Sequence, residues 1–353
     1  MGWRFVVTDL AGRALGEPTA YEKRLSVGAS KTATAAFRIN SSDSLWDQIQ
    51  AGSSMLRVFD SGGNDAFYGP IIGEDEAGDK DGKITVQYAA ADLSWRFGKR
   101  FLGRDTAGLG TVYTSTDSAQ IALAGLAAIN GDEATGVTAG SADACVPRTT
   151  TVLWKRYLDL LSELGAVAGS YEWRLTYTSN GAQVAPTAAL DLKAFLGTDR
   201  SSGTSAVFLE YGTGTKANCS AYTRTRSIEQ LASDVWVLGG ASTAVASASD
   251  PGRPYKRHED VISYGDISDV ALLDALAAAH VAIRKRPRIV AALTPFAKLT
   301  PRYGVDYQLG DIVNGRIYAG GKDRLSGQVR IWNADIAIDD NGGEQATLSL
   351  APA

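Results

Sequence analysis

The sequence contains very little cysteine and histidine. Its 353 residues include two cysteines, Cys145 and Cys219, and two histidines, His258 and His280. None of the four has a Cys or His partner at the spacing of metal ligands, which argues against a zinc site. The cysteines are expected to be free and buried, as in a protein made in a reducing cytoplasm, and a single disulfide is the alternative.

Long apolar runs and strong net charge are also missing. The most apolar stretches, 121–129 and 271–283, are shorter than the roughly 18 residues that cross a bilayer, and the N-terminus lacks the features of a secretory signal. We therefore expect no membrane insertion. The 35 basic and 39 acidic residues leave a net charge of only −4, without a long block of one sign. This balance predicts no nucleic-acid-binding or membrane-binding surface.

Motifs that carry catalysis are absent from the sequence. There is no Gly-x-Ser-x-Gly elbow and no phosphate-binding or dinucleotide-binding glycine loop. The acidic segment 74–82 resembles a calcium loop, but Ala77 and Tyr88 occupy its first and twelfth ligand positions. We interpret that segment as a solvated hairpin tip. The sequence thus predicts no enzyme, no catalytic residue, no cofactor and no metal.

Most of the sequence has a β pattern. Residues 1–97 form short alternating runs separated by turns, which is typical of an antiparallel β domain, with a short helix expected at 43–50. The same pattern returns in residues 206–353. There it is interrupted by a short helix expected at 228–232 and a longer one at 266–285, which ends before a proline.

The middle of the chain, residues 98–205, predicts an inserted α+β lobe. Helices are expected at 117–129 and 151–164. In the second, apolar residues recur at spacings of three and four, which places them on one buried face. A strand pair is expected at 171–178 and 188–192, joined by a turn at Asn180-Gly181.

The two β regions resemble each other at a constant offset of about 258 positions, as counted along the sequence. This offset suggests a domain duplication, although glycines shared by unrelated turns would produce a similar pattern. The predicted fold class is therefore α+β, mainly β, with two related antiparallel β-barrel-like tube domains, an inserted α+β lobe and one long helix. Three such chains could close a ring of six similar barrels. The matched positions are Gly62-Gly63 with Gly320-Gly321, Asp65 with Asp323, Phe67 with Leu325, Gly69 with Gly327 and Ile71 with Val329.

Six segments give the chain a resemblance to the baseplate-hub or tail-tip-hub family of long-tailed bacteriophages, also called minor tail proteins. They are residues 34–39, 67–71, 234–240, 307–313, 327–331 and 343–348.

The resemblance implies a structural protein at the tail tip of the virion. It would be a homotrimer whose pseudo-sixfold ring continues the tail-tube channel and anchors distal-tail, minor tail or fibre proteins. The lobe would lie on the outside and contact distal-tail or fibre proteins. The tape-measure protein and DNA would pass through the channel without specific binding. Many relatives carry a lytic or fibre domain after the hub, and none is expected after Ala353.

One basic cluster, Arg284, Lys285, Arg286 and Arg288, lies at the C-terminal end of the long predicted helix. It either offsets the helix dipole or forms a subunit interface that faces an acidic turn of a neighbour. Three other functions stay open: a hexameric distal-tail adaptor, a hydrolase that uses buried carboxylates, and a carbohydrate-binding module for host attachment. The last would use exposed members of the set Trp3, Trp46, Trp95, Trp173, Trp236 and Trp332.

Overall fold

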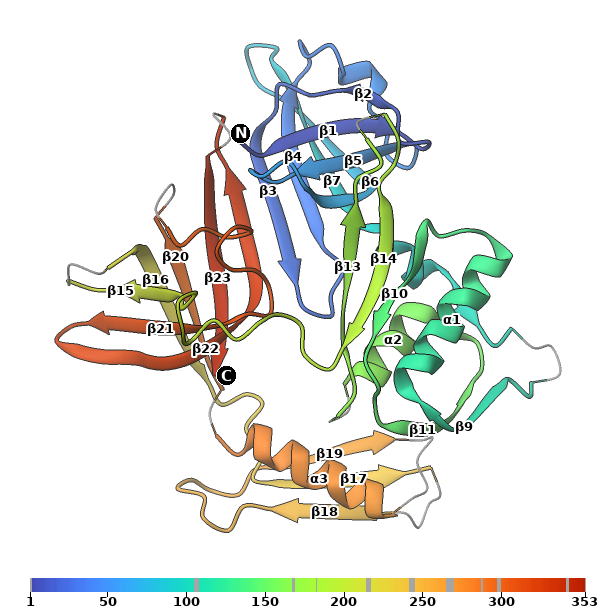
Figure 1. The fold of residues 1–353 in the computed structure, drawn as a ribbon, viewed down its shortest axis with the longest axis vertical. Helices are drawn as coiled ribbons and strands as arrows, with labels where there is room; N and C mark the ends of the chain where they lie inside the picture. Colours follow the sequence, from blue (N-terminus) through green and yellow to red (C-terminus); the bar gives the residue numbers. More distant parts are fainter. Residues whose placement is uncertain are drawn as a thin grey trace.

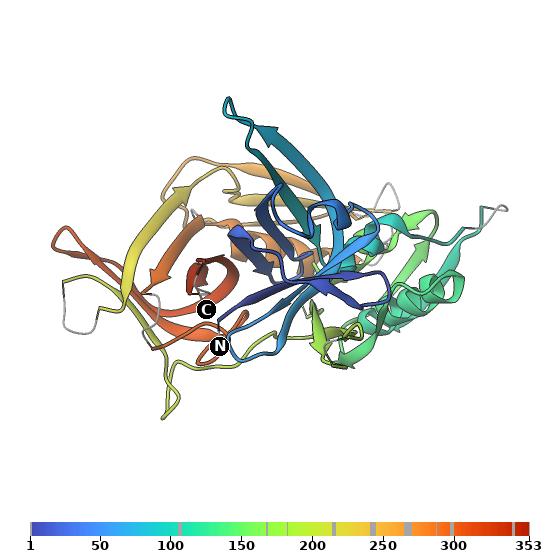
Figure 2. The ribbon, with the colours of Figure 1, turned by 90° about the horizontal axis from the view of Figure 1, so that it is seen from above.

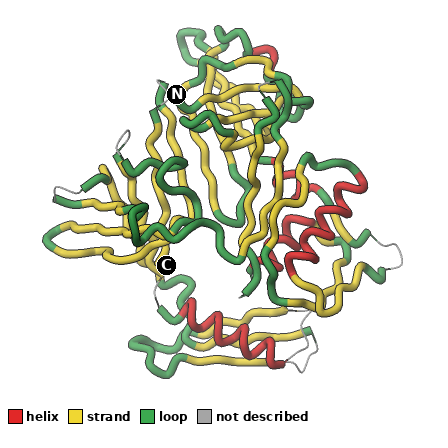
Figure 3. Tube along the Cα trace, in the orientation of Figure 1, coloured by secondary structure: helices red, strands yellow, loops and turns green. Residues whose placement is uncertain are grey.

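The computed structural model describes residues 2–104, 108–166, 169–181, 183–213, 217–240, 245–264, 270–286, 288–296, 300–340 and 343–352. Strands dominate this part of the chain, and the helices lie at its periphery (Figures 1 and 3). The mainly β character predicted from the sequence is thus confirmed.

One large sheet of thirteen strands runs through the molecule. Eight of them form a single series of antiparallel neighbours. The first and last strands of this series do not pair with each other in the described residues, so the sheet is not closed into a barrel. In spatial order they are β16 (Cys219–Ser227), β20 (Arg288–Pro295), β23 (Glu344–Pro352), β22 (Lys322–Ile338), β3 (Tyr21–Gly28), β4 (Thr34–Asn40), β7 (Ile84–Ala91) and β6 (Asp65–Gly78).

Two long strands, β6 and β22, each belong to two layers of the sheet. The first part of β6 pairs with β5 (Ser54–Phe59), which continues to β1 (Arg4–Asp9) and β2 (Ala14–Gly16). The first part of β22 pairs with β21 (Ile312–Ala319), which continues to β15 (Phe208–Tyr211). The later part of β6 then pairs with β7, and that of β22 with β23 and β3. We call β6 and β22 the corner strands.

The corner strands have bulges at equivalent places. Ala66 and Arg324 are each left out of the register near the start of their strand. Ile72 and Trp332 are each left out where the strand leaves its first partner for its second. A bulge bends a strand and increases its twist, so these four residues help to turn each corner strand between layers. The unit β5–β6–β7 and the unit β21–β22–β23 therefore share both their pairing order and their irregularities.

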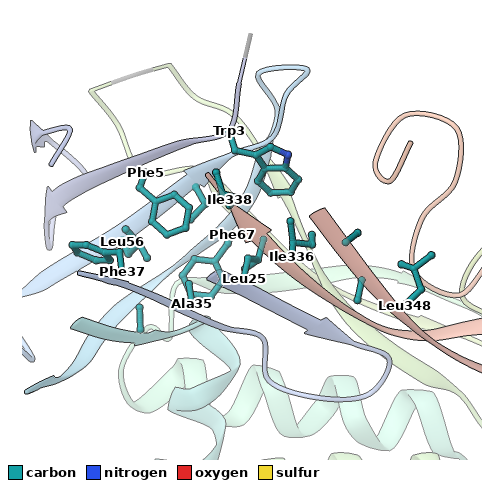
Figure 4. Packing of buried hydrophobic residues seen from close by; sticks show 14 of the residues in the cluster. Trp3, Phe5, Leu25, Ala35, Phe37, Leu56, Phe67, Ile336, Ile338 and Leu348 are labelled. Atoms are coloured by element: carbon teal, nitrogen blue, oxygen red, sulfur yellow. The ribbon is translucent and has the colours of Figure 1, made fainter. Parts of the chain in front are cut away.

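The two β regions share one hydrophobic core. A row of directly opposed residues crosses β23, β22, β3, β4, β7 and β6, and each of its members is buried. Phe5, Leu56 and Phe67 of the overlying layer pack onto this face of the sheet (Figure 4). The row consists of Ala346, Ile336, Leu25, Ala35, Ala90 and Ile71.

The inserted lobe has its own core and a mixed three-stranded sheet. Helix α1 (Ser118–Asp132) begins where the Asp117 side chain accepts a hydrogen bond from the Ala119 amide at 2.8 Å, as predicted. The expected strand pair is confirmed as β13 (Glu172–Thr178) and β14 (Thr187–Lys193). The remaining elements are η2 (Leu93–Lys99), β8 (Phe101–Leu102), β9 (Thr111–Asp117), β10 (Val137–Ala142), β11 (Pro147–Val152), β12 (Lys155–Arg156) and α2 (Tyr157–Gly165).

Three of the short helices predicted from the sequence were wrong in whole or in part. Segment 151–164 is helical only from Tyr157, because the β-branched residues before it pair in β11 and Trp154 has a positive φ of 48°. Segment 43–50 contains a single 3₁₀ turn, η1 (Trp46–Gln48). Segment 228–232 forms only a turn, which the Leu231 amide closes on the Ile228 carbonyl.

A third unit lies between β16 and β20. Strands β17 (Asp234–Gly239), β18 (Val245–Ser249) and β19 (Glu259–Tyr264) form a separate sheet beneath helix α3 (Val270–Arg284), with its own core. Assigning 235–238 to the second β domain was therefore wrong, because an apolar strand pattern does not identify the sheet that it joins. The long helix is confirmed from Val270, and residues 266–269 lie outside the described part.

Candidate channel wall and subunit interface

The large sheet has one open face, on which alanine, serine and threonine side chains lie together with Arg24, Asp335, Gln345 and Ile72. One row of directly opposed residues on this face crosses the same six strands as the buried row, which lies on the other face of the sheet. The sheet also forms a hollow of about 520 Å³ over this face. Charges are few and of both signs there, and Ser26 donates a hydrogen bond to Asp335 at 2.5 Å across the β3–β22 junction. The row consists of Gln345, Ala337, Arg24, Ala36, Ala89 and Gly73.

Both ends of the eight-stranded series are edges. Strand β16 pairs with β20 on one side, and from Cys219 to Ser227 no described strand bonds to its other side. The part of β6 from Gly73 to Gly78 pairs with β7 alone among the described strands. The acidic segment read as a hairpin tip is thus partly strand, and the tip begins at Asp79. Figure 2 shows the β6–β7 hairpin, in teal, projecting beyond the rest of the chain.

The predicted basic cluster is divided by the structure. Arg284 forms an ion pair with Asp260 of β19. Lys285 and Arg286 instead line a cavity of about 610 Å³ together with Arg226 of β16. The side chain of Arg288 lies outside the described part, although its backbone opens β20 opposite Ser227. Two of the cluster's cations, Lys285 and Arg286, therefore lie next to the β16 edge.

A buried arginine fastens the lobe to the second β region. Arg330 of β22 forms an ion pair with Glu172 of β13 and donates to the Leu196 carbonyl at 2.9 Å. Its guanidinium also lies 4.0 Å from the Phe195 ring centre and 4.5 Å from that of Trp332. Because the arginine is nearly buried, this ion pair fixes the linker that leaves the lobe.

A second buried arginine fastens the lobe to the first β region. Arg57 of β5 forms an ion pair with Asp65, with both side chains almost fully buried. It also donates to the carbonyls of Gly181 at 2.8 Å and Val184 at 3.1 Å, which lie in the loop between β13 and β14. The lobe is thus held at two places by charge-assisted hydrogen bonds.

The two cysteines are unpaired with each other, and both histidines have hydrogen-bond partners within the fold. Both cysteines are free, and burial raises the pKa of the Cys219 thiol to about 12. His280 shares a hydrogen bond of 2.8 Å with the Tyr264 hydroxyl, and His258 lies 2.7 Å from the Lys256 carbonyl. Within the described ranges there is no group of three metal-binding side chains and no helix long and apolar enough to span a membrane.

The tryptophans do not gather into an exposed platform. Trp3 and Trp173 are buried, whereas Trp236 and Trp332 are a little over one third exposed, in different sheets. The tryptophan with the largest exposed fraction is Trp154, at 55%. Trp154 was not among the residues proposed for sugar binding.

The fold is that of phage tail proteins. A tail protein from Neisseria meningitidis MC58 superimposes with a TM-score of 0.68 and 15% identity, over 99% of this chain and 97% of its own. The 43 kDa tail protein of prophage MuSo2 from Shewanella oneidensis gives 0.66 and 14% over the same shares. The Escherichia coli c3393 protein, a type VI secretion component with structural similarity to T4 tail proteins gp27 and gp5, gives 0.55 and 8%, over 98% and 76%. No family model and no curated protein matches the sequence.

Proposed function

We propose that this chain is a structural hub of a phage tail tip or baseplate, with no catalytic role. Three copies form a ring whose open sheet faces line a channel that continues the tail tube. The fold shared with tail proteins supports a structural role in a phage tail.

The repeated arrangement of strands around β6 and β22 supports a ring with nearly sixfold symmetry. Each β region contributes four consecutive strands to the series, ending in its own corner strand: β3–β4–β7–β6 in the first region and β16–β20–β23–β22 in the second. Three chains would therefore supply six similar four-stranded walls, or 24 strands. Such a ring is threefold in composition and nearly sixfold in shape, which a duplicated domain of residues 1–97 and 206–353 would provide.

The open face suits a channel through which polymers slide. Its side chains are mostly alanine, threonine and serine, and its charges, Arg24 and Asp335, are of opposite sign. A strongly basic wall would hold DNA through its phosphates, whereas this face would let a tape-measure protein and then DNA pass. The lobe, held outside the sheet by Arg57 and Arg330, would be available to distal-tail, minor tail or fibre proteins.

The basic residues after α3 belong to the subunit contact in this proposal. Lys285 and Arg286 lie beside Arg226 of β16 and would add positive charge to this edge in the contact, together with Arg288. Arg284 would not take part, because it forms an ion pair with Asp260 of its own chain.

The native mass over a concentration series, with electron microscopy of the assembled species, tests the hub. A trimer with an open centre and six similar walls around it is expected. A chain that stays monomeric at every concentration would contradict the ring.

A further inference from the structure

Within one chain, strands β3 and β22 join the two halves of the large sheet. This internal strand pairing suggests how neighbouring chains would pair in the ring. The junction pairs β3, which lies at the end of the first wall opposite its corner strand, with β22, the corner strand of the second wall. The second wall ends in β16, and the first wall ends in its corner strand β6. In a ring of similar walls, β16 of one copy should therefore meet β6 of the next, as β3 meets β22. This step rests on the proposed ring.

The direction of the strands allows this contact. The eight strands are successively antiparallel, so β16 and β6 run in opposite directions. Rotation about a ring axis preserves each strand's direction along that axis. The free edge of β16 and the free edge of a neighbour's β6 would thus form another antiparallel pair, without reversing the order of the sheet.

The strand pairings also give the register. The bulges at Ile72 and Trp332 align β6 with β22, so that Glu76 corresponds to Ile336. Following the pairings from β23 through β20 to β16, and from β7 through β4 to β3, makes Arg224 correspond to Leu25. Leu25 and Ile336 are direct partners in the internal junction. The same register therefore sets Arg224 opposite Glu76.

We propose that β16 of one copy pairs with β6 of the next, with Arg224 opposite Glu76 and Arg226 opposite Glu74. We call this contact the seam. The second pair follows from the internal pair Val27–Ala334 in the same way. Opposite charges that face each other on adjacent strands stabilise their pairing, and like charges oppose it.

The side-chain directions agree with the register. Arg224 is paired with buried Ala291 in its sheet, and Glu76 with buried Val86, so both lie on the face that carries the core. The four seam charges would meet on one face, and the other face would continue the channel wall through Thr225 and Asp75. An exposed edge strand is a template for unwanted pairing. Here the charges disfavour pairing of β16 with another β16 and favour pairing with β6.

The four seam charges have no ion-pair partner among the described residues of their own chain. No ion pair joins Arg224, Arg226, Glu74 or Glu76 to another described residue. Burial raises the pKa of Tyr88 to about 12, and the negative charges of Glu74 and Glu76 contribute to that shift. A surface with this field is complementary to a second copy that presents arginines.

Disulfide trapping tests the register. With Cys145→Ser as background, Asp75→Cys and Thr225→Cys would lie directly opposite across the seam, within the distance that a disulfide spans. Oxidation should produce covalent dimers and closed trimers. The matched control combines Asp75→Cys with Thr223→Cys, which is on the same face but two residues away along β16. Equal cross-linking of the two pairs, or none by either, would overturn the seam.

Charge exchange tests the pairing itself. The variant Glu74→Arg/Glu76→Arg and the variant Arg224→Glu/Arg226→Glu should each need at least roughly tenfold more protein to assemble, because like charges would face each other. All four substitutions together should restore assembly. Asp159→Arg/Asp274→Arg, which reverses two exposed carboxylates elsewhere, should assemble normally. If wild-type trimers form and both reversals leave assembly unchanged, the seam is wrong and the hub stands. A strict monomer that no cysteine pair traps would overturn both.

Discussion

Leu25 and Ile336 lie directly opposite each other across the β3–β22 junction, both nearly fully buried. They join the sheet of the first β region to that of the second. Replacing either residue with alanine should lower the free energy of unfolding by about 2–5 kcal/mol, because each leaves a cavity in the shared core.

The same two residues should be energetically coupled. Neighbours in contact commonly show interaction energies of about 0.5–3 kcal/mol in a double-mutant cycle. Urea unfolding of the wild type, Leu25→Ala, Ile336→Ala and the double variant measures this coupling. Strictly additive losses would mean that the junction contributes no pairwise stabilisation.

Glu172→Gln should strongly destabilise the attachment of the lobe. The change leaves the Arg330 guanidinium nearly buried without a carboxylate partner, at a cost of about 3–5 kcal/mol. Glu133→Gln is the matched control, because Glu133 forms its ion pair with Arg100 at the surface and is 73% exposed. That pair should contribute far less to stability, because solvent screens an exposed ion pair. Similar losses in the two variants, measured by urea unfolding, would contradict this prediction.

Two glycines of β6 should respond differently to a methyl group. A Cβ on Gly69 would lie only 1.9 Å from the Ala91 carbonyl oxygen, so that the backbone must move. Gly69→Ala should therefore cost about 3 kcal/mol or more. Gly78→Ala meets no atom within 4 Å and should change stability by less than about 1 kcal/mol. Thermal unfolding of both variants provides the comparison, and equal melting temperatures would refute the close approach at Gly69.

The Asp92 carboxyl should give stability a specific pH dependence. It accepts hydrogen bonds from the amides of Ala33 at 3.0 Å and Ser94 at 2.9 Å, but burial raises its pKa from 3.8 to about 6. The folded state therefore binds this proton more tightly than the unfolded state does. The resulting contribution is complete below pH 3.8, falls as the pH rises, and is lost above about pH 6. It amounts to about 3 kcal/mol.

Asp92→Asn isolates that contribution, because asparagine does not titrate. The free energy of unfolding of the wild type minus that of the variant should decrease between about pH 4 and pH 6 and then become constant. Other carboxyl groups cancel in this difference. A difference independent of pH would show that Asp92 titrates at the same pH in the folded and unfolded states.

Local patterns were sufficient to predict the mainly β character of the chain and several of its elements. Alternating apolar residues correspond to strands such as β4, and Asp117 begins α1 as expected. The prediction failed where two local signals competed, as in segment 151–164. There the helical spacing of Leu153 and Trp154 pointed to a buried face, but both side chains are exposed because β-branched residues extend the chain before α2.

Long-range pairing was not predictable from the sequence. The 258-residue offset indicated related halves, and the bulges at Ala66 and Arg324 occur at that offset. Nothing in either half indicates that β3 would pair with β22, because the pairing of distant strands has no local signature. For the same reason the sequence could not identify β17 as part of a separate sheet.

The sequence pointed to one part of the candidate interface and missed another. The basic cluster at 284–288 was visible as a run of charge. Arg224 and Arg226 were not recognised, and the acidic segment with Glu74 and Glu76 was interpreted as a solvated hairpin tip. Charges nevertheless recur at every second residue in both segments. That spacing places like charges on one face of a strand, but it becomes meaningful only when the strand is known to be an edge.

The junction between β3 and β22 also determines when the protein can finish folding. Ser26 and Asp335, which hydrogen-bond across it, are 309 positions apart in the chain. A ribosome that adds about 5–20 residues per second needs roughly 15–60 s to make that segment. During this time β3 has an unpaired edge, which is exposed to other nascent chains or to a chaperone. The sheet can be completed only after nearly the whole chain has been synthesised, so correct assembly depends on protection of the first β region during translation.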